Sequence, residues 1–126
     1  MARFCNQPAT LAWPMVIEFY REHVAAGEPL QPLLHIVEFI AESPLANQLF
    51  AGTSKFDLLL FNAKDYLNAD GVLQIAYRPQ IHEFKFHYAD FSGQAETKTC
   101  SEAEAFQTLR LYLGLKFGVL FKLPFN

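Results

Sequence analysis

The fold is decided by residues 72–117, which read VLQIAYRPQIHEFKFHYADFSGQAETKTCSEAEAFQTLRLYLGLKF. In the middle of this stretch apolar and polar side chains alternate, and Phe84, Phe86 and Tyr88 fall at every second position. A period of two is what a β-strand requires when only one of its faces is buried. We therefore predict a sheet with an apolar face toward a core and an ionic face toward water.

Turn signals divide this sheet into three antiparallel strands, at about 72–77, 81–90 and 95–100. The first turn places Ile75 opposite Phe84. The second turn places His87 opposite Lys98. On this register the outer, ionic face of the sheet carries Glu83, Lys85, His87, Glu96 and Lys98.

A C-terminal helix is predicted at about 102–117. It opens with Ser101 and Glu104, which form a capping box when each side chain accepts a hydrogen bond from the other residue's backbone N–H. Gly118 suits the end of the helix. The apolar residues recur at helical spacing and form one stripe, made of Phe106, Leu109, Leu113 and Phe117. We expect this stripe to pack on the apolar face of the sheet.

The N-terminal half of the chain predicts two or three helices and one more strand. The helices are expected at Thr10 to Ala26, Leu33 to Ala41 and, as two turns, Pro44 to Phe50. A strand follows at about 56–62, and because its run from Leu58 to Phe61 does not alternate, we expect it to be buried on both faces. The prediction is thus a single α+β domain over residues 1–126 with a four-stranded, mainly antiparallel sheet.

The strand at about 56–62 raises a question about the edge of the sheet. In a simple meander it would be an edge strand, and an exposed apolar edge invites aggregation. Either a helix covers it, or the strand order is not a meander, or a second copy of the chain pairs with it. The third alternative is a reason to expect a homodimer.

Composition excludes several classes of function. Of 126 residues 52% are apolar and 13 are Phe, so the chain can bury a large core. A net charge of −3 opposes nucleic acid as the main partner. No apolar run reaches the roughly 20 residues of a membrane-spanning helix, and the first residues lack the apolar segment of a secretory signal. The two cysteines, Cys5 and Cys100, fit no disulfide or metal pattern, so we expect reduced thiols and a cytoplasmic location.

No segment carries a convincing catalytic or metal-binding motif. The run from His82 to His87 resembles the zinc motif HExxH, but its second His comes one residue late. A strand would also point the two imidazoles to opposite faces, so they could not hold one metal together. Cys100 precedes a helix, where a thiol can become reactive, yet a buried cysteine is the simpler interpretation. We predict no catalytic residue, metal or cofactor.

Two hypotheses for function remain. The first is a non-enzymatic domain that binds another protein, alone or as a homodimer. Its candidate partner-binding residues are Trp13, Lys85, His87 and Phe121. The second is a small-molecule-binding protein or an enzyme with an aromatic-lined pocket between helices and sheet. The residues that would orient its ligand are Tyr77, His82 and Tyr88.

In size, acidity and order of elements the chain resembles small bacterial immunity and chaperone-type proteins. The resemblance concerns the layout of a fold and rests on no shared motif. It implies a protein partner without establishing one, because one fold serves many functions.

Overall fold

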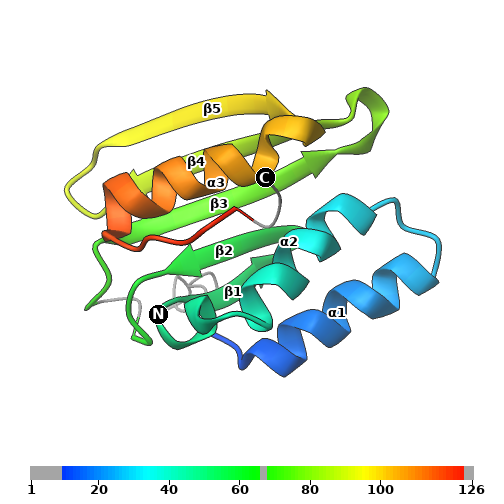
Figure 1. The fold of residues 1–126 in the computed structure, drawn as a ribbon, viewed down its shortest axis with the longest axis horizontal. Coiled ribbons are helices and arrows are strands. Elements are labelled where there is room, and N and C mark those ends of the chain that lie inside the picture. Colours follow the sequence, from blue (N-terminus) through cyan, green and yellow to red (C-terminus); the bar gives the residue numbers. More distant parts are fainter. Residues whose placement is uncertain (1–9, 66–67, 124–126) are drawn as a thin grey trace, which may run out of the picture.

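The computed structural model describes residues 10–65 and 68–123 of the chain. It has one antiparallel sheet in the simple meander order β1-β2-β3-β4-β5 (Figure 1). The strands are β1 (Phe50–Ser54), β2 (Asp57–Phe61), β3 (Gly71–Arg78), β4 (Glu83–Asp90) and β5 (Ala95–Ser101). The helices are α1 (Trp13–Ala25), α2 (Gln31–Ala41) and α3 (Ala105–Tyr112), the last continued by a π-helical turn, Leu113–Phe117.

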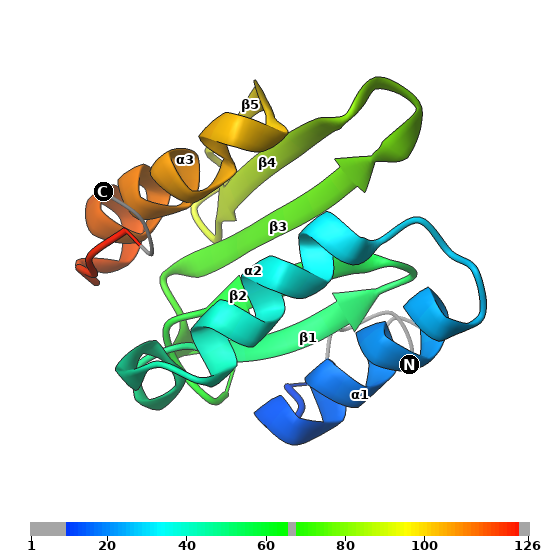
Figure 2. The same ribbon diagram turned by 45° about the vertical axis from the view of Figure 1, so that its right-hand side comes forward.

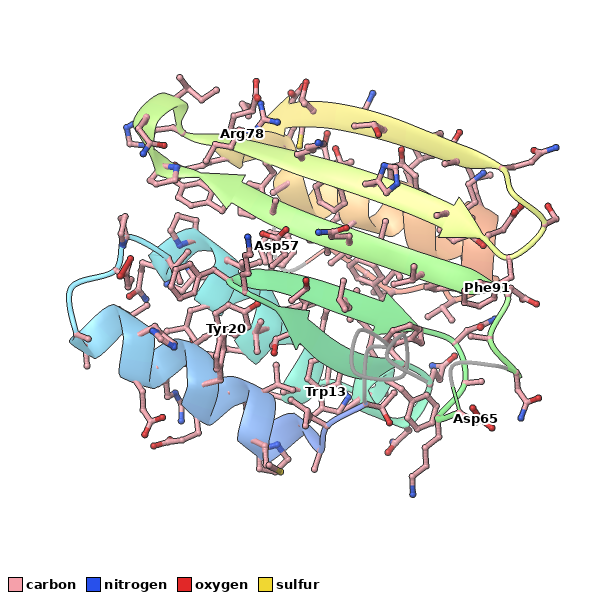
Figure 3. The ribbon with its side chains drawn as sticks, turned by 180° about the vertical axis from the view of Figure 1, so that it is seen from behind. Trp13, Tyr20, Asp57, Asp65, Arg78 and Phe91 are labelled. Carbon is pink, nitrogen blue, oxygen red and sulfur yellow. The ribbon has the colours of Figure 1, made fainter. Side chains whose placement is uncertain are left out.

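All three helices lie on one side of the sheet (Figures 1 and 2). This side is the apolar face predicted from the alternation, since Phe84 and Phe86 of β4 are 1% and 0% exposed. Phe39 of α2 and Phe106 of α3 meet edge to face, so the two helices cover the sheet together. The opposite side, called the outer face below, has no helix over it among the described residues (Figure 3). The α+β class, the two N-terminal helices and the C-terminal helix are confirmed.

The sheet has five strands where four were predicted. The predicted helix from Pro44 to Phe50 shrinks to a 3-10 turn, Pro44–Asn47, in which the Leu45 N–H donates a hydrogen bond to the Ser43 hydroxyl. The chain then enters β1, which pairs along its whole length with β2. Pairing with β2 thus stabilises Phe50 as part of a strand, although the sequence predicted it as the end of a helix. Tertiary pairing overrides a weak local preference.

The new strand answers the question about the sheet edge. With β1 beside it, β2 is an interior strand, and its run from Leu58 to Phe61 is buried on both faces as predicted. Leu58 and Leu60 join the core under the helices, while Leu59 and Phe61 join a smaller apolar cluster on the outer face. None of the three alternatives proposed for this edge applies, and the argument for a homodimer through this strand loses its basis.

The predicted register of the first hairpin is shifted by two residues. Ile75 lies opposite Phe86 instead of Phe84, across a four-residue loop from Pro79 to His82. A shift of two preserves which face each side chain occupies, because the side-chain period of a strand is two. The division into an apolar and a polar face therefore holds for β3 and β4.

The predicted register of the second hairpin is wrong by one residue, and here the faces change. His87 lies opposite Thr97, and Tyr88 opposite Glu96. Five residues, Asp90 to Gln94, separate the last pair of the hairpin, Ala89 and Ala95. The Asp90 carboxylate closes this turn by accepting hydrogen bonds from the N–H groups of Ser92 and Gln94. In consequence Glu96 and Lys98 lie on the helix side of β5, and threonines occupy its outer face.

The C-terminal helix begins later than predicted. A 3-10 turn, Glu102–Glu104, precedes α3, and the Ser101 hydroxyl bonds to the Glu104 carboxylate at 3.3 Å rather than capping a backbone N–H. Within the stripe Leu109 and Leu113 are fully buried. The helix ends at Gly118, whose φ of 68° is the left-handed conformation expected there.

Candidate functional site

The space between helices and sheet, where an aromatic-lined pocket was predicted, is filled by core side chains. Phe86 is completely buried and stacks on Tyr112 of α3, with ring centroids 5.9 Å apart. Phe84 and Leu109 belong to the same continuous core. These aromatic rings serve as core packing, and they give the small-molecule hypothesis no support in this region.

Two of the three predicted ligand-binding residues do come together, at the end of β3. The Tyr77 hydroxyl donates a hydrogen bond to the Glu102 carboxylate. His82 Nδ1 lies 2.9 Å from Oε2 of Glu102 and 3.3 Å from the Tyr77 hydroxyl. His82 has a left-handed backbone, with φ of 50°, in the loop between β3 and β4. The cluster therefore ties this loop to the segment that leads into α3.

The pKa values in this cluster are those of a structural contact. Burial and the hydrogen bond to Glu102 raise the pKa of Tyr77 to about 12. The hydrogen bond from Tyr77, and then that from His82, lower the pKa of Glu102 below its usual value. At neutral pH the phenol thus keeps its proton and the carboxylate keeps its charge. Neither group is poised to exchange a proton with a substrate, because general acid–base catalysis favours a pKa near the working pH.

Tyr88 lies at the other end of β4, away from Tyr77 and His82. It is 6% exposed, its ring meets Phe117 edge to face at 5.9 Å, and Lys116 Nζ lies 5.2 Å from the ring centroid. The three predicted ligand-binding residues consequently do not converge on one point.

Trp13 and Phe121, two of the predicted partner-binding residues, are engaged within the chain. The Trp13 indole N–H donates to the backbone carbonyl of Leu49 at 3.0 Å. The Phe121 ring packs against Phe39 of α2, with centroids 5.4 Å apart, so the C-terminal tail docks onto the core. Cys100 is buried, and burial raises the pKa of its thiol, as suits a packing role. Cys5 lies outside the described residues.

The other two predicted partner-binding residues, Lys85 and His87, meet in a depression on the outer face. This polar hollow, of about 250 Å³, is lined by Asp57, Gln74, Ala76, Lys85 and His87. It forms where β3 runs past the end of its pairing with β2, which involves only Leu58 to Leu60 (Figure 3). Ala76 lies directly opposite Lys85, and its short side chain leaves the floor of the hollow open.

The polar groups of the hollow differ in how they are satisfied. Gln74 Nε2 donates to Asp57 Oδ2 at 2.7 Å, and His87 Nδ1 lies 2.7 Å from the Thr97 hydroxyl. Arg78 and Glu83, at the rim, form a cross-strand ion pair of 3.6 Å. Half-buried Lys85 has no hydrogen-bond acceptor or ion-pair partner among the described residues. The hollow therefore presents one ammonium group that is available to a ligand.

No protein-family model, curated protein or solved structure matches this chain. Within residues 10–65 and 68–123 no group of three or more His, Cys, Asp or Glu side chains could hold a metal ion. None of the helices in this part of the chain has the length and apolar character needed to cross a bilayer.

Sequence reasoning found Lys85 and His87 but missed Asp57. The alternation of polar and apolar residues in β3 already placed Gln74 on the polar face, and the structure pairs it with His87. Asp57 precedes a run of four buried apolar residues, and nothing in that run showed which neighbour its carboxylate would meet. The one available signal was that Asp57 is charged and adjoins buried Leu58. Burying a carboxylate there without a partner would be costly, so a partner was to be expected.

Proposed function

We propose that this chain is a non-enzymatic protein-binding domain whose binding surface is the outer face around the polar hollow. The observation that carries the proposal is Lys85, a half-buried ammonium group beside Asp57 and Gln74 with no partner of its own in the described chain. A carboxylate of a partner is the group that would stabilise this lysine most, because charge-assisted hydrogen bonds are stronger than hydrogen bonds between neutral groups.

The size of the hollow favours a side chain of a partner over a free small molecule. Its volume of about 250 Å³ is below the range of roughly 300–1,000 Å³ that is usual for ligand pockets. A shallow depression on an exposed strand face can accept one Asp or Glu side chain while the surrounding strands supply a flat contact area. The expected partner is therefore a protein that presents a carboxylate to Lys85, in keeping with the expected cytoplasmic location.

The proposal can be tested by crosslinking from the outer face. Thr99 lies opposite Lys85 and is exposed, so a photoreactive amino acid at this position should capture a defined protein in cells of the source organism. The control position is Glu18, which is exposed on α1. Capture of the same proteins from both positions would contradict the proposal.

The captured protein then allows a direct test of Lys85. Lys85→Gln should weaken the affinity of the purified pair by about tenfold or more, since charged hydrogen bonds contribute roughly 1.5–3 kcal/mol. Lys122→Gln, which removes the same charge from an exposed position on the tail, should leave the affinity unchanged. Titration calorimetry measures both, and equal affinities for the two variants would contradict the role of Lys85.

A further inference from the structure

The outer edge of β5 is the open edge of the sheet. Within the described part of the chain no strand pairs with it. The Asp90 N–H donates to the Gln94 carbonyl at 2.9 Å, and hydrogen-bonded and non-hydrogen-bonded pairs alternate along an antiparallel ladder. Counting from that pair, the backbone groups of Glu96 and Lys98 point to β4, and those of Thr97 and Thr99 point outward. The edge can therefore accept another strand.

We propose that the strand that completes this edge is β5 of a second copy of the chain, paired antiparallel about a two-fold axis through Thr97. The interface leaves the outer face free, so this inference stands independently of the function proposed above. It joins two five-stranded sheets into one and places both polar hollows on the same continuous surface.

Charge selects this register over its neighbours. With Thr97 at the axis, Glu96 of each copy lies opposite Lys98 of the other, on the same face and in a non-hydrogen-bonded pair, where side chains approach most closely. With Lys98 at the axis, two lysines would oppose each other. With Thr99 at the axis, Glu96 would face Glu102 of its mate. Glu96 can accept the second ammonium, since its Oε1 binds Lys116 at 2.8 Å and half of its side chain is exposed.

The apolar residues beside β5 fit the same axis. Leu111 and Leu115 are 49% and 71% exposed. Together with Glu96, Thr97 and Lys98 they line a hollow of about 370 Å³ between α3 and the edge. α3 runs antiparallel beside β5 (Figure 1), so Leu111 lies toward the Lys98 side of Thr97 and Leu115 toward the Glu96 side. The two-fold axis therefore brings Leu111 of one copy toward Leu115 of its mate, which would remove both from water.

A lysine in the middle of an edge strand usually protects against unwanted pairing. At this edge Lys98 opposes some incoming strands and permits others. Any incoming strand without a carboxylate opposite Lys98 leaves that charge unpaired, whereas a second β5 supplies Glu96 twice. The same residue thus disfavours general strand addition and permits this one.

The test is the oligomeric state of charge-exchanged variants, measured by sedimentation equilibrium from micromolar to millimolar concentration. Glu96→Lys and Lys98→Glu each replace two attractive pairs by repulsive ones and should each raise the dimer dissociation constant by about tenfold or more. An equimolar mixture of the two variants should form heterodimers with near wild-type affinity, because opposite charges face each other again. Lys116→Gln removes the ion pair with Glu96 and the ammonium over the Tyr88 ring, both of which are contacts within one chain, and should leave the dimer intact.

A second route does not depend on charge. Thr97→Pro removes an N–H that points away from β4, so the backbone ladder within the chain keeps its bonds while the centre of the proposed pairing is lost. Within the chain it also removes the contact of the Thr97 hydroxyl with His87 Nδ1, which lies outside the backbone ladder. This variant should be monomeric and retain the wild-type circular dichroism spectrum. A wild-type chain that stays monomeric throughout would overturn the inference, as would a dimer that neither the charge variants nor Thr97→Pro weaken, or a mixture that fails to recover association.

Discussion

The two edges of the sheet are finished in different ways. At β1, Leu11 pairs with Ala51 through an N–H···O bond of 2.7 Å, and the Trp13 indole bonds to the Leu49 carbonyl just before the strand. Ala51 is fully buried. At β5, by contrast, residues 95–99 are all exposed and threonines alternate with charges. The chain's own N-terminal segment covers part of one edge, at Ala51, whereas the other edge carries exposed threonines and charged side chains.

A covering segment and charged side chains both protect a strand edge from unwanted pairing, but they do so with different consequences. A covered edge depends on packing, so its failure should cost stability. A charged edge costs the fold little and remains able to bind. Three predictions sharpen this comparison by measuring what each edge contributes to the free energy of unfolding.

The largest effect is expected at the covered edge. Trp13→Ala removes a half-buried ring and leaves the Leu49 carbonyl without its donor, and should lower the free energy of unfolding by about 2–3 kcal/mol. Trp13→Phe keeps most of the packing and should lose about 1 kcal/mol. Urea unfolding followed by circular dichroism measures both. A loss below about 0.5 kcal/mol for Trp13→Ala would mean that the β1 edge is not held by this contact.

An intermediate effect is expected where the open edge joins α3. Glu102→Gln weakens the bonds to Tyr77 and His82, and should cost about 0.5 kcal/mol at pH 7, a small value because the carboxylate is partly exposed. Since folding lowers the pKa of Glu102, its contribution is present above the carboxyl's unfolded pKa and is lost as pH falls through the folded value.

The pH dependence separates this contact from a general charge effect. The stability difference between wild type and Glu102→Gln should vanish in acid, whereas Glu104→Gln, which removes a neighbouring carboxylate that does not bond to Tyr77, should not reproduce it. At the alkaline end the raised pKa of Tyr77, about 12, predicts stability that is present below the phenol's unfolded pKa and lost as pH rises toward the folded value. Denaturant titrations across this range provide the test.

The smallest effect is expected at the open edge itself. Thr99→Ala alters an exposed side chain of β5 and should change the free energy of unfolding by no more than about 0.5 kcal/mol. Thr53→Ala, on the covered strand β1, lies opposite buried Leu58 and should cost more. A larger loss at Thr99 than at Thr53, measured under conditions where the chain is monomeric, would reverse the comparison.

The candidate surface was only partly predictable. Alternation alone placed Lys85 and His87 on the polar face, because a strand's side-chain period does not depend on its neighbours. It could not show that Asp57 and Gln74 would complete the hollow, since that depends on how far β2 extends along β3. Nor could it show that Glu102 would meet Tyr77, as the two are joined only when β5 returns beside β4.

By itself the sequence determined the local periods and one helix end: the helical stripe of α3, the apolar face of β3 and β4, and the stop at Gly118, which adopts a positive φ. Tertiary structure alone decided the fifth strand, the one-residue shift that moved Glu96 and Lys98 to the helix side, and which edge of the sheet remains open. The physical reason is that a side-chain period is set within one segment, whereas pairing depends on loop geometry and on the partner that a strand finds.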